Sequence, residues 1–399
     1  MRILRCLVGS ALFLTVWLAV NVRSVAAQQP AAAAPAAAAA GGDKTPPVVP
    51  EPGFIERQLL ALEKAADEGP HGFSVTFGDI MPGSGASLGP AYGRTFDGDV
   101  VFAAKAVYSL HNAKVVQVSL ESPPLSRRRI QFRSRARWQD VPDISFHGLA
   151  PGRREDEASY AETISEFSAV AAFRPVPLLR FEAGTGAELF TTSAGDEDKG
   201  HLELFAGAPG VGADPRYLHS RASAALDSRE SEGYTRSGSL VRATLHDYRQ
   251  WSAGPYSFRR VDLAAEQYVP FLNRTRVVYL GLYASTTTPV RGAAVPFFLM
   301  PEAGGQVLRG YDLYRFRNRH SVVVTVEYRW TIRNYLDGAV FYDAGKAVAE
   351  RRDLDVSGLH GSFGAGISLH GPRSTALRLE VARSREGTHF VVSFRPVGG

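Results

Sequence analysis

The stretch "SVVVTVEYRWTI" at residues 321–332 decides the fold class, because its side chains alternate in chemical character. Successive side chains on a β-strand point to opposite faces, so one face of this segment is apolar and the other mostly polar. The apolar face carries Val322, Val324, Val326, Tyr328, Trp330 and Ile332. The other face carries Ser321, Thr325, Glu327, Arg329 and Thr331, together with Val323. The pattern predicts a two-faced strand rather than a helix.

Other segments of the chain repeat this alternation. In "RIQFRSRARW", which starts at residue 129, the apolar side chains share a face with Ser134, and the opposite face carries Gln131 and a basic ladder. The members of this basic ladder are Arg129, Arg133, Arg135 and Arg137. In "ALRLEVARS", at residues 376–384, Leu377, Leu379 and Val381 oppose Arg378, Glu380 and Ala382. A row of arginines does not suit the interior of a soluble sandwich, but it suits the wet lumen of a barrel.

The alternating segments are about 9–15 residues long, whereas ordinary strands have about 5–6 residues and tilted membrane-spanning strands need about 9–11. Because sheet edges cannot stay open in lipid, such strands must close into a barrel. The predicted fold class is therefore all-β: a 16-stranded antiparallel transmembrane β-barrel over residues 71–399, with a short N-terminal helix. The predicted strands begin near residues 71, 85, 97, 114, 128, 159, 176, 216, 234, 256, 274, 319, 336, 359, 374 and 387.

The N-terminus reads as an export signal. Residues 1–27 combine Arg2 and Arg5, an apolar run from Cys6 to Val20, and small residues before Gln28, which is typical of a cleaved secretory signal peptide. An uncleaved membrane anchor is the alternative. Removal of residues 1–27 leaves 42 basic and 40 acidic residues, a net charge of +2, so charge gives no case for nucleic-acid binding. With this signal the predicted localisation is the bacterial outer membrane.

Two segments lie between the signal peptide and the first strand. Residues 28–53 are rich in Ala and Pro and predict a disordered tether. Residues 54–68 place Ile55, Leu59, Leu62 and Ala66 on one side of an amphipathic helix. We expect this helix at the periplasmic mouth of the barrel or inside its lumen; a surface helix packed on the next domain is the alternative.

A long loop at residues 290–318 carries the triplet Arg309-Gly310-Tyr311. Glu327 lies on the polar face of the following strand, and "FYDAG" at residues 341–345 places Asp343 and Gly345 on the inward face of the next one. Arg309 could therefore meet two luminal carboxylates if the loop folds inward. In a wet lumen the pair would contribute about as much as an exposed one, about 0–1 kcal/mol. A solvated loop arginine beside a turn glycine is the alternative for Arg309.

This pattern resembles the BamA/TamA superfamily of outer-membrane assembly and secretion barrels, also called the bacterial surface antigen family. That family has a 16-stranded barrel, and its sixth extracellular loop carries an apolar-Arg-Gly-aromatic motif that folds into the lumen. Leu308 to Tyr311 match that motif, and Phe341 to Gly345 match the Phe-x-Asp-x-Gly motif of the thirteenth strand. Glu327 matches a second acidic position. The resemblance implies a structural loop lock made by Arg309, Gly310, Tyr311, Glu327, Phe341, Asp343 and Gly345.

The resemblance also implies a function, with one departure. Most members carry periplasmic POTRA domains of about 75 residues that collect clients, and residues 28–70 leave no room for one. The expected function is insertion or translocation of polypeptides at the outer membrane. The expected partners are outer-membrane lipid, unfolded outer-membrane or secreted client polypeptides, and a separate periplasmic partner protein.

Other function classes fit the sequence less well. Adjacent His and Ser residues point to opposite faces of a strand, and we find no hydrolase, zincin or phosphate-loop motif, so an outer-membrane hydrolase is the remote alternative. Cys6 is the only cysteine, so the mature chain has none, and neither a metal site nor a cofactor is expected. A passive pore that favours anions through the basic ladder, or a purely structural barrel, is the nearer alternative.

Overall fold

The fold is known from a computed structural model that describes residues 53–67, 71–96, 99–127, 129–150, 156–195 and 205–394. The expected signal peptide and all of the expected tether except Gly53 lie outside these residues. The predicted helix is present as α2 (Phe54–Asp67). Within the described ranges, no helix is both long and apolar enough to cross a membrane.

Sixteen strands of the described chain form one antiparallel sheet, in which each strand pairs with its neighbours in chain order. Every strand begins within four residues of its predicted start, so the alternating pattern located the strands correctly. The strands are β1 (Gly72–Asp79), β2 (Ala86–Phe96), β3 (Val100–Ser109), β4 (Lys114–Glu121), β5 (Ile130–Phe146), β6 (Ala158–Val176), β7 (Leu179–Ala194), β8 (Arg216–Asp227), β9 (Gly238–Gln250), β10 (Phe258–Phe271), β11 (Arg276–Pro289), β14 (His320–Arg333), β15 (Leu336–Val348), β16 (His360–His370), β17 (Thr375–Ser384) and β18 (Gly387–Phe394).

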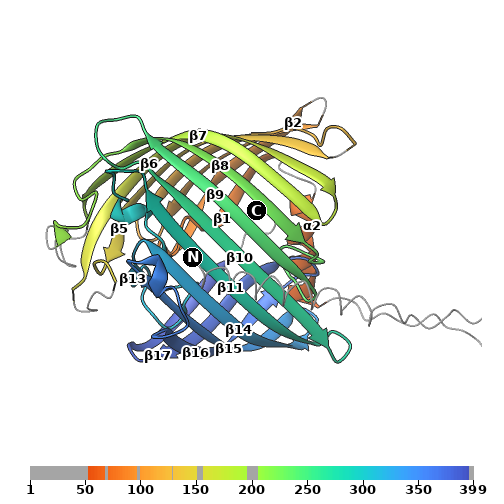
Figure 1. Cartoon of the computed structure of the whole chain (residues 1–399). Helices are drawn as coiled ribbons and strands as arrows, with labels where there is room; N and C mark the ends of the chain where they lie inside the picture. Colours follow the sequence, from red (N-terminus) through yellow and green to blue (C-terminus); the bar gives the residue numbers. More distant parts are fainter. Residues whose placement is uncertain are drawn as a thin grey trace, which may run out of the picture.

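The sheet curls back on itself, so that its first and last strands approach one another (Figure 1). Fifteen neighbouring strand pairs are joined by antiparallel ladders, whereas the described residues of β1 and β18 touch without a ladder. We call the line where β1 meets β18 the seam. The 16-stranded antiparallel sheet is confirmed; its closure into a membrane barrel stays a prediction.

The two ends of the sheet are defined here by the connection from β11 to β14. The long loop 290–318 leaves the sheet at what we call the loop end and contains η3 (Phe297–Leu299), β12 (Glu302–Ala303) and β13 (Phe316–Arg317). Because the strands are antiparallel, the short connections β4–β5, β6–β7 and β16–β17 lie at the opposite end, the turn end. A short 3-10 helix, η4 (Arg351–Asp353), follows β15 at the loop end.

Three strands are longer than the sequence predicted. β5, β6 and β7 contain 17, 19 and 16 residues, against the expected 9–15. Their extra residues lie at the loop end, where Phe146 and Tyr160 pack on Phe297 of the loop, with ring centroids 4.6 and 5.0 Å apart. The added length thus builds a wall for the loop, and burial there offsets the entropy of ordering it.

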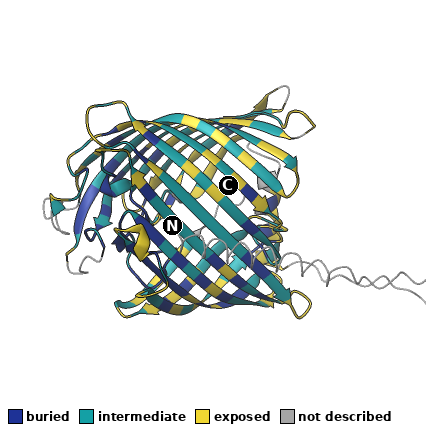
Figure 2. Cartoon of the chain, viewed as in Figure 1, coloured by how far each residue is buried: buried dark blue, intermediate teal, exposed yellow. Residues whose placement is uncertain are grey.

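The buried apolar side chains gather around the loop rather than filling the space inside the sheet evenly. One cluster joins Phe146 and Tyr160 to Phe297, and a second joins Leu308, Tyr311, Phe316 and Val323. Along the strands, buried and exposed residues alternate (Figure 2). Phe132, on the outward face of β5, is 50% exposed.

Helix α2 contacts the turn end. The carboxylate of Glu63, which is buried, accepts hydrogen bonds through Oε1 from the backbone N–H groups of Arg373 and Ser374, at 2.9 and 2.8 Å, and from the Ser374 hydroxyl at 2.7 Å. These residues form the β16–β17 connection. Contact with this end of the sheet agrees with a helix at the mouth of the barrel, and which side of a membrane that mouth faces stays a prediction.

Candidate functional site

The candidate site is the place where loop 290–318 meets the inner faces of β14, β15 and β17. The loop turns sharply here: the Gly305 N–H donates to the Tyr311 carbonyl at 3.2 Å. Leu308, just before the arginine, is fully buried. The turn therefore directs the Arg309 side chain toward the sheet instead of toward solvent.

Arg309 holds Asp343 of β15 with three hydrogen bonds. Its Nε donates to Oδ2 at 2.7 Å, its Nη2 donates to Oδ1 at 2.9 Å, and its backbone N–H donates to Oδ2 at 3.2 Å. Thr325 of β14 supplies a further donor to Oδ1 at 2.9 Å. This is the bidentate geometry for which the planar guanidinium is suited and a lysine ammonium is not.

The remaining guanidinium nitrogen of Arg309 reaches two more carboxylates. Nη1 donates to Glu327 Oε2 of β14 at 2.9 Å and to Glu380 Oε1 of β17 at 2.6 Å. The ring of Phe341 lies under the guanidinium, with its centroid 3.4 Å from Cζ, and completes a cation–π contact. One loop side chain thus joins three strands of the sheet.

Two further arginines balance the charge of this group. Arg329 Nε donates to Glu327 at 2.5 Å, and Arg378 Nη2 donates to Glu380 at 2.7 Å and to Glu327 at 3.0 Å. We call the set the Arg309 cluster; its three carboxylates and three guanidinium groups sum to zero formal charge. The members are Arg309, Glu327, Arg329, Asp343, Arg378 and Glu380.

The centre of the cluster is buried where the sequence predicted an exposed pair in a wet lumen. Arg309 is 5% exposed and Asp343 is 0% exposed, so the expectation of an exposed-type ion pair is corrected. Burial opposes the charge of Arg309, but the hydrogen bonds to Asp343 and the charges of Glu380 and Glu327 outweigh it and raise the pKa of Arg309 above its ordinary value. Removal of one partner would leave the buried network with one uncompensated charge, and breaking a buried pair in this way typically costs about 3–5 kcal/mol.

The neighbours of Arg309 in the motif position it. Gly310 has φ +91°, and a Cβ there would lie 2.9 Å from the Ser362 Cβ, so the turn needs glycine for conformation and for space. Tyr311 donates its hydroxyl to the Gly361 carbonyl of β16 at 3.1 Å. A Cβ on Gly345 would lie 2.8 Å from the Val322 carbonyl oxygen, so this position favours glycine by close approach alone.

A second group of loop arginines was not predicted. Arg317 is buried and donates to the Tyr160 hydroxyl of β6 at 3.0 Å and to Glu302 at 3.1 Å. Arg315 holds Glu386 with two hydrogen bonds of 2.9 and 3.0 Å. The loop is therefore tied to both sides of the curved sheet. The sequence "YRFRN" shows that basic and aromatic residues are concentrated here, but it does not indicate which strands their side chains contact.

The four arginines of the predicted basic ladder do not share one environment in the structure. Arg129 is exposed in the turn before β5, and its N–H donates to Leu125 at 2.9 Å, so it lies outside the strand. Arg133 pairs with Glu121 at 3.1 Å and Arg135 with Glu166 at 2.6 Å, whereas Arg137 contacts Gln139. When the pairing of successive strands is followed from β15 to β5, Arg133 lies on the same face of the sheet as Asp343, which is the inner face.

The neighbouring residues His219 and Ser220 of β8 do not form a nucleophile–base couple. His219 points away from Ser220: it bonds Glu188 at 2.5 Å and His246 at 2.9 Å, while the Ser220 hydroxyl bonds Thr185. In the described part of the chain, no group of three or more His, Cys, Asp or Glu side chains has the geometry of a metal site.

Comparisons with known proteins agree on the architecture. A family model described as the Omp85 superfamily domain matches residues 104–389. The structure of BamA from Haemophilus ducreyi lacking POTRA domains 1–3 is similar, with a TM-score of 0.62 and 14% identity over 81% of this chain and 70% of that one. CdiB from Escherichia coli gives a TM-score of 0.55 and 11% identity, over 80% of this chain and 61% of that one. None of the curated proteins matches the sequence. At these identities the two structures establish a shared fold.

Proposed function

The chain belongs to the Omp85 superfamily, and from that premise we propose that it is an integral outer-membrane β-barrel that helps to insert or translocate polypeptides. In this role the outward apolar faces of the strands contact outer-membrane lipid. The clients are unfolded outer-membrane or secreted polypeptides. A separate periplasmic protein that collects clients is a further partner in this proposal.

The observation that carries this proposal is the seam. The described residues of β1 and β18 touch without a ladder, whereas every other pair of neighbouring strands is joined by one. Unpaired strand edges present rows of free N–H and C=O groups that accept another strand. A client strand in lipid needs such partners, since unsatisfied backbone groups in hydrocarbon cost several kcal/mol each. The seam therefore offers a client its first hydrogen bonds.

The Arg309 cluster has a supporting role in this proposal. We assign the loop lock to Arg309, Gly310, Tyr311, Glu327, Phe341, Asp343 and Gly345, with Glu380 as a further carboxylate. The lock keeps loop 290–318 inside the barrel and against β14–β17, next to the last strands before the seam. Loop position and seam opening are then coupled through one wall of the sheet.

A reversible cross-link at the seam tests the function. The mature sequence has no cysteine, so one cysteine placed along β1 and one along β18 give an unambiguous disulfide. The chain is reconstituted in lipid vesicles with an unfolded outer-membrane barrel protein as client, and client insertion is measured by protease protection. We expect oxidation to stop insertion and reduction to restore it. The matched control places the pair on β9 and β10, which are already paired, and should have no effect. Equal insertion with the seam open and cross-linked would contradict the proposal.

A passive, anion-favouring pore is the second candidate, because one observation favours it. On the inner face of β3–β6, Lys105, Arg133, Arg135 and Arg137 stand against Glu121 and Glu166, which leaves an excess of positive charge. Single-channel recording distinguishes the two functions. A pore should conduct anions steadily with the loop in place, whereas a loop-filled barrel should conduct strongly only after residues 290–318 are shortened.

A further inference from the structure

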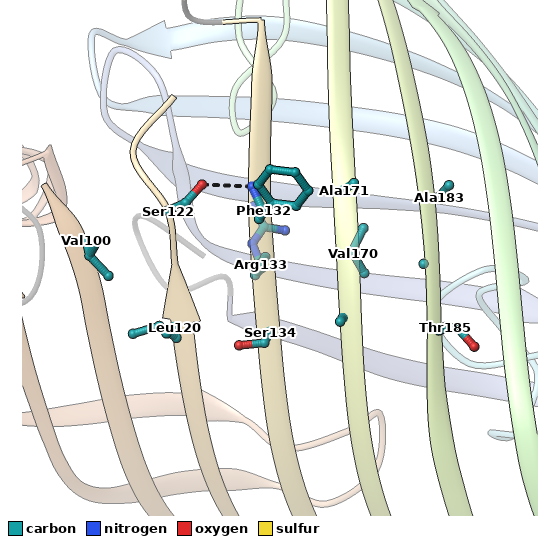
Figure 3. Close-up of a pocket in the computed structure, with 12 residues that line it drawn as sticks. Val100, Leu120, Ser122, Phe132, Arg133, Ser134, Val170, Ala171, Ala183 and Thr185 are labelled. Atoms are coloured by element: carbon teal, nitrogen blue, oxygen red, sulfur yellow. Dashed lines mark hydrogen bonds between the residues drawn. The ribbon is translucent and has the colours of Figure 1, made fainter. Parts of the chain in front are cut away.

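Two hollows of the structure differ in their lining. The hollow on the outer face of β3–β7 is lined mostly by apolar and small side chains, among them Leu120 and Phe132 (Figure 3). An apolar lining is expected on this face, where the proposed function places lipid. The second hollow lies inside the sheet beside the Arg309 cluster and has a volume of about 610 Å³. We call it the inner chamber; it is lined by charged side chains and by tyrosines such as Tyr268 and Tyr283.

The connection between β8 and β9, residues 228–237, borders the inner chamber at the turn end. Its residues Arg229, Glu232, Gly233 and Thr235 belong to the chamber lining. The connection reaches the turn ends of β15, β16 and β17, although β10, β11 and β14 lie between β9 and β15 in the sheet. It therefore crosses part of the turn-end mouth of the sheet, and we call it the strap.

The strap contacts the β16–β17 connection through its backbone and two hydroxyl groups. Gly233 and Ser374 form an isolated parallel bridge. The Ser231 hydroxyl donates to the Arg373 carbonyl at 2.6 Å, and the Thr375 hydroxyl donates to the Gly233 carbonyl at 3.0 Å. A Cβ on Gly233 would lie 2.7 Å from the Arg373 carbonyl oxygen, so this close approach favours glycine.

A second contact joins the strap to the inner wall formed by β15 and β16. The Tyr234 hydroxyl donates to Asp337 Oδ2 at 2.7 Å, and Arg236 Nη1 donates to the same oxygen at 2.9 Å. The ring of Tyr234 stacks on that of His370, with centroids 3.8 Å apart. Asp337 and His370 are both buried. The strap thus supplies two donors to a carboxylate that would otherwise face the chamber with fewer partners.

The way the strap is attached allows it to separate from the wall without unfolding the sheet. Among the described residues, none of the buried apolar clusters includes a strap residue. The backbone pairing of the strap with the opposite wall is a single bridge instead of a ladder. Segments with few buried apolar contacts open locally at a much lower free energy than the whole domain. The inner chamber beside the strap gives it space to move.

Helix α2 holds the same connection that receives the strap. The carboxylate of Glu63 accepts hydrogen bonds from the N–H groups of Arg373 and Ser374, whereas the strap bonds the Arg373 carbonyl. The β16–β17 connection is therefore bonded on one side by α2 and on the other by the strap. The helix supports the surface on which the strap rests.

We propose that the strap is a gate at the turn-end mouth of the lumen. When it contacts Asp337 and the β16–β17 connection, it closes the inner chamber toward the turn end. When these contacts break, solutes and polypeptide segments reach the chamber from that end. The gate goes beyond the proposed function, because it controls entry to the lumen and not the seam; it requires only that the sheet is closed into a barrel.

The access of a thiol reagent to the inner chamber tests the gate. The mature sequence has no cysteine, so Val307→Cys gives a single reporter at a chamber-lining residue that is 44% exposed. The full mature chain with this reporter is placed in lipid nanodiscs, and its rate of reaction with a charged, membrane-impermeant maleimide is measured. Tyr234→Phe removes one hydrogen bond to a carboxylate and should raise the rate about tenfold. Gly233→Val, whose side chain does not fit against Arg373, should raise it further.

Two controls separate opening of the strap from general loosening of the protein. Gly207→Val makes the same substitution in the β7–β8 loop, where a Cβ meets nothing within 4 Å, and should leave the rate at Val307→Cys unchanged. A second reporter, Val356→Cys, lies at the loop end and is 75% exposed, so it should react equally fast in every variant. A heat-modifiable gel shift confirms folding, and Tyr234→Phe alone suffices if Gly233→Val does not fold.

An unchanged reaction rate at Val307→Cys in the folded strap variants would overturn the proposal and make the strap a fixed brace. Equal acceleration at both reporters would also overturn it, because the whole sheet would then have loosened. The assay contains no client. Failure of client insertion would therefore count against the proposed function and leave the gate standing, whereas an unchanged rate here would leave the seam proposal standing.

Discussion

Two groups of arginines occupy the same inner face of one sheet, yet their surroundings differ. On β14–β17 and the loop, Arg309 is 7% exposed in its side chain and bonds carboxylates that are 0–5% exposed. On β5, the Arg133 side chain is 45% exposed and pairs with Glu121, which is 36% exposed. The first group is less exposed because the loop packs against it. The comparison teaches that loop packing, more than arginine itself, sets the strength of these ion pairs.

Replacing Asp343 should give the largest effect on this comparison. Asp343→Ala leaves the guanidinium of Arg309 buried without its bidentate partner, and we expect the free energy of unfolding to fall by about 3–5 kcal/mol. Urea unfolding in lipid vesicles, followed by tryptophan fluorescence, measures it. A smaller fall combined with rapid proteolysis of residues 290–318 would mean that the loop leaves the sheet while the strands stay folded. No change in either readout would contradict the buried pair.

Arg309→Lys keeps the charge and removes the planar fork. The single ammonium group of lysine can replace only one of the two hydrogen bonds that Nε and Nη2 donate to Asp343. At least one charged hydrogen bond is therefore lost, which lowers the unfolding free energy by roughly 2 kcal/mol. The same unfolding measurement should place this variant between the original chain and Asp343→Ala. If lysine restored full stability, charge alone would account for the pair and its geometry would not matter.

Gly310→Ala tests whether the turn that directs Arg309 is required. The residue has φ +91° and its added Cβ would crowd Ser362, so we expect a loss of about 1–3 kcal/mol in unfolding free energy. Gly292→Ala is the matched control in the same loop: its φ is +76°, but a Cβ there meets nothing within 4 Å. The control should cost about 1 kcal/mol. Equal costs would show that crowding at Gly310 is unimportant.

Arg133→Ala should give the smallest effect. Its ion pair with Glu121 is exposed, and such pairs contribute about 0–1 kcal/mol. The unfolding free energy should therefore change by less than about 1 kcal/mol, while the anion preference of any residual conductance should fall because one inner positive charge is lost. A loss as large as that of Asp343→Ala would erase the distinction between the two walls.

The strands were predictable because their signal is local. Alternation of neighbouring side chains predicted the start of the short strand β4 correctly. It also predicted that Arg378 and Glu380 share the polar face of β17. The resemblance to a family then supplied Arg309 and Asp343, which the structure brings within hydrogen-bond distance. The role of these residues as a lock stays a prediction.

Other features depend on contacts that the sequence does not encode locally. Glu380 is 71 residues from Arg309, so no spacing rule connects the two. The burial of Arg309 comes with the packing of Leu308, Tyr311 and Phe316 of the loop against the sheet, which alternation cannot foresee. The extra length of β6 follows likewise from the aromatic side chains of the loop that it supports.

The central claim is that Arg309 and Asp343 act as one unit that holds loop 290–318 inside the sheet, and a double-mutant cycle tests it most directly. Unfolding free energies are measured for the original chain, Arg309→Ala, Asp343→Ala and the double variant. We expect the double variant to be little worse than either single one, so that the coupling energy is nearly as large as a single loss, about 3 kcal/mol or more. Fully additive losses, with coupling below about 0.5 kcal/mol, would contradict the claim.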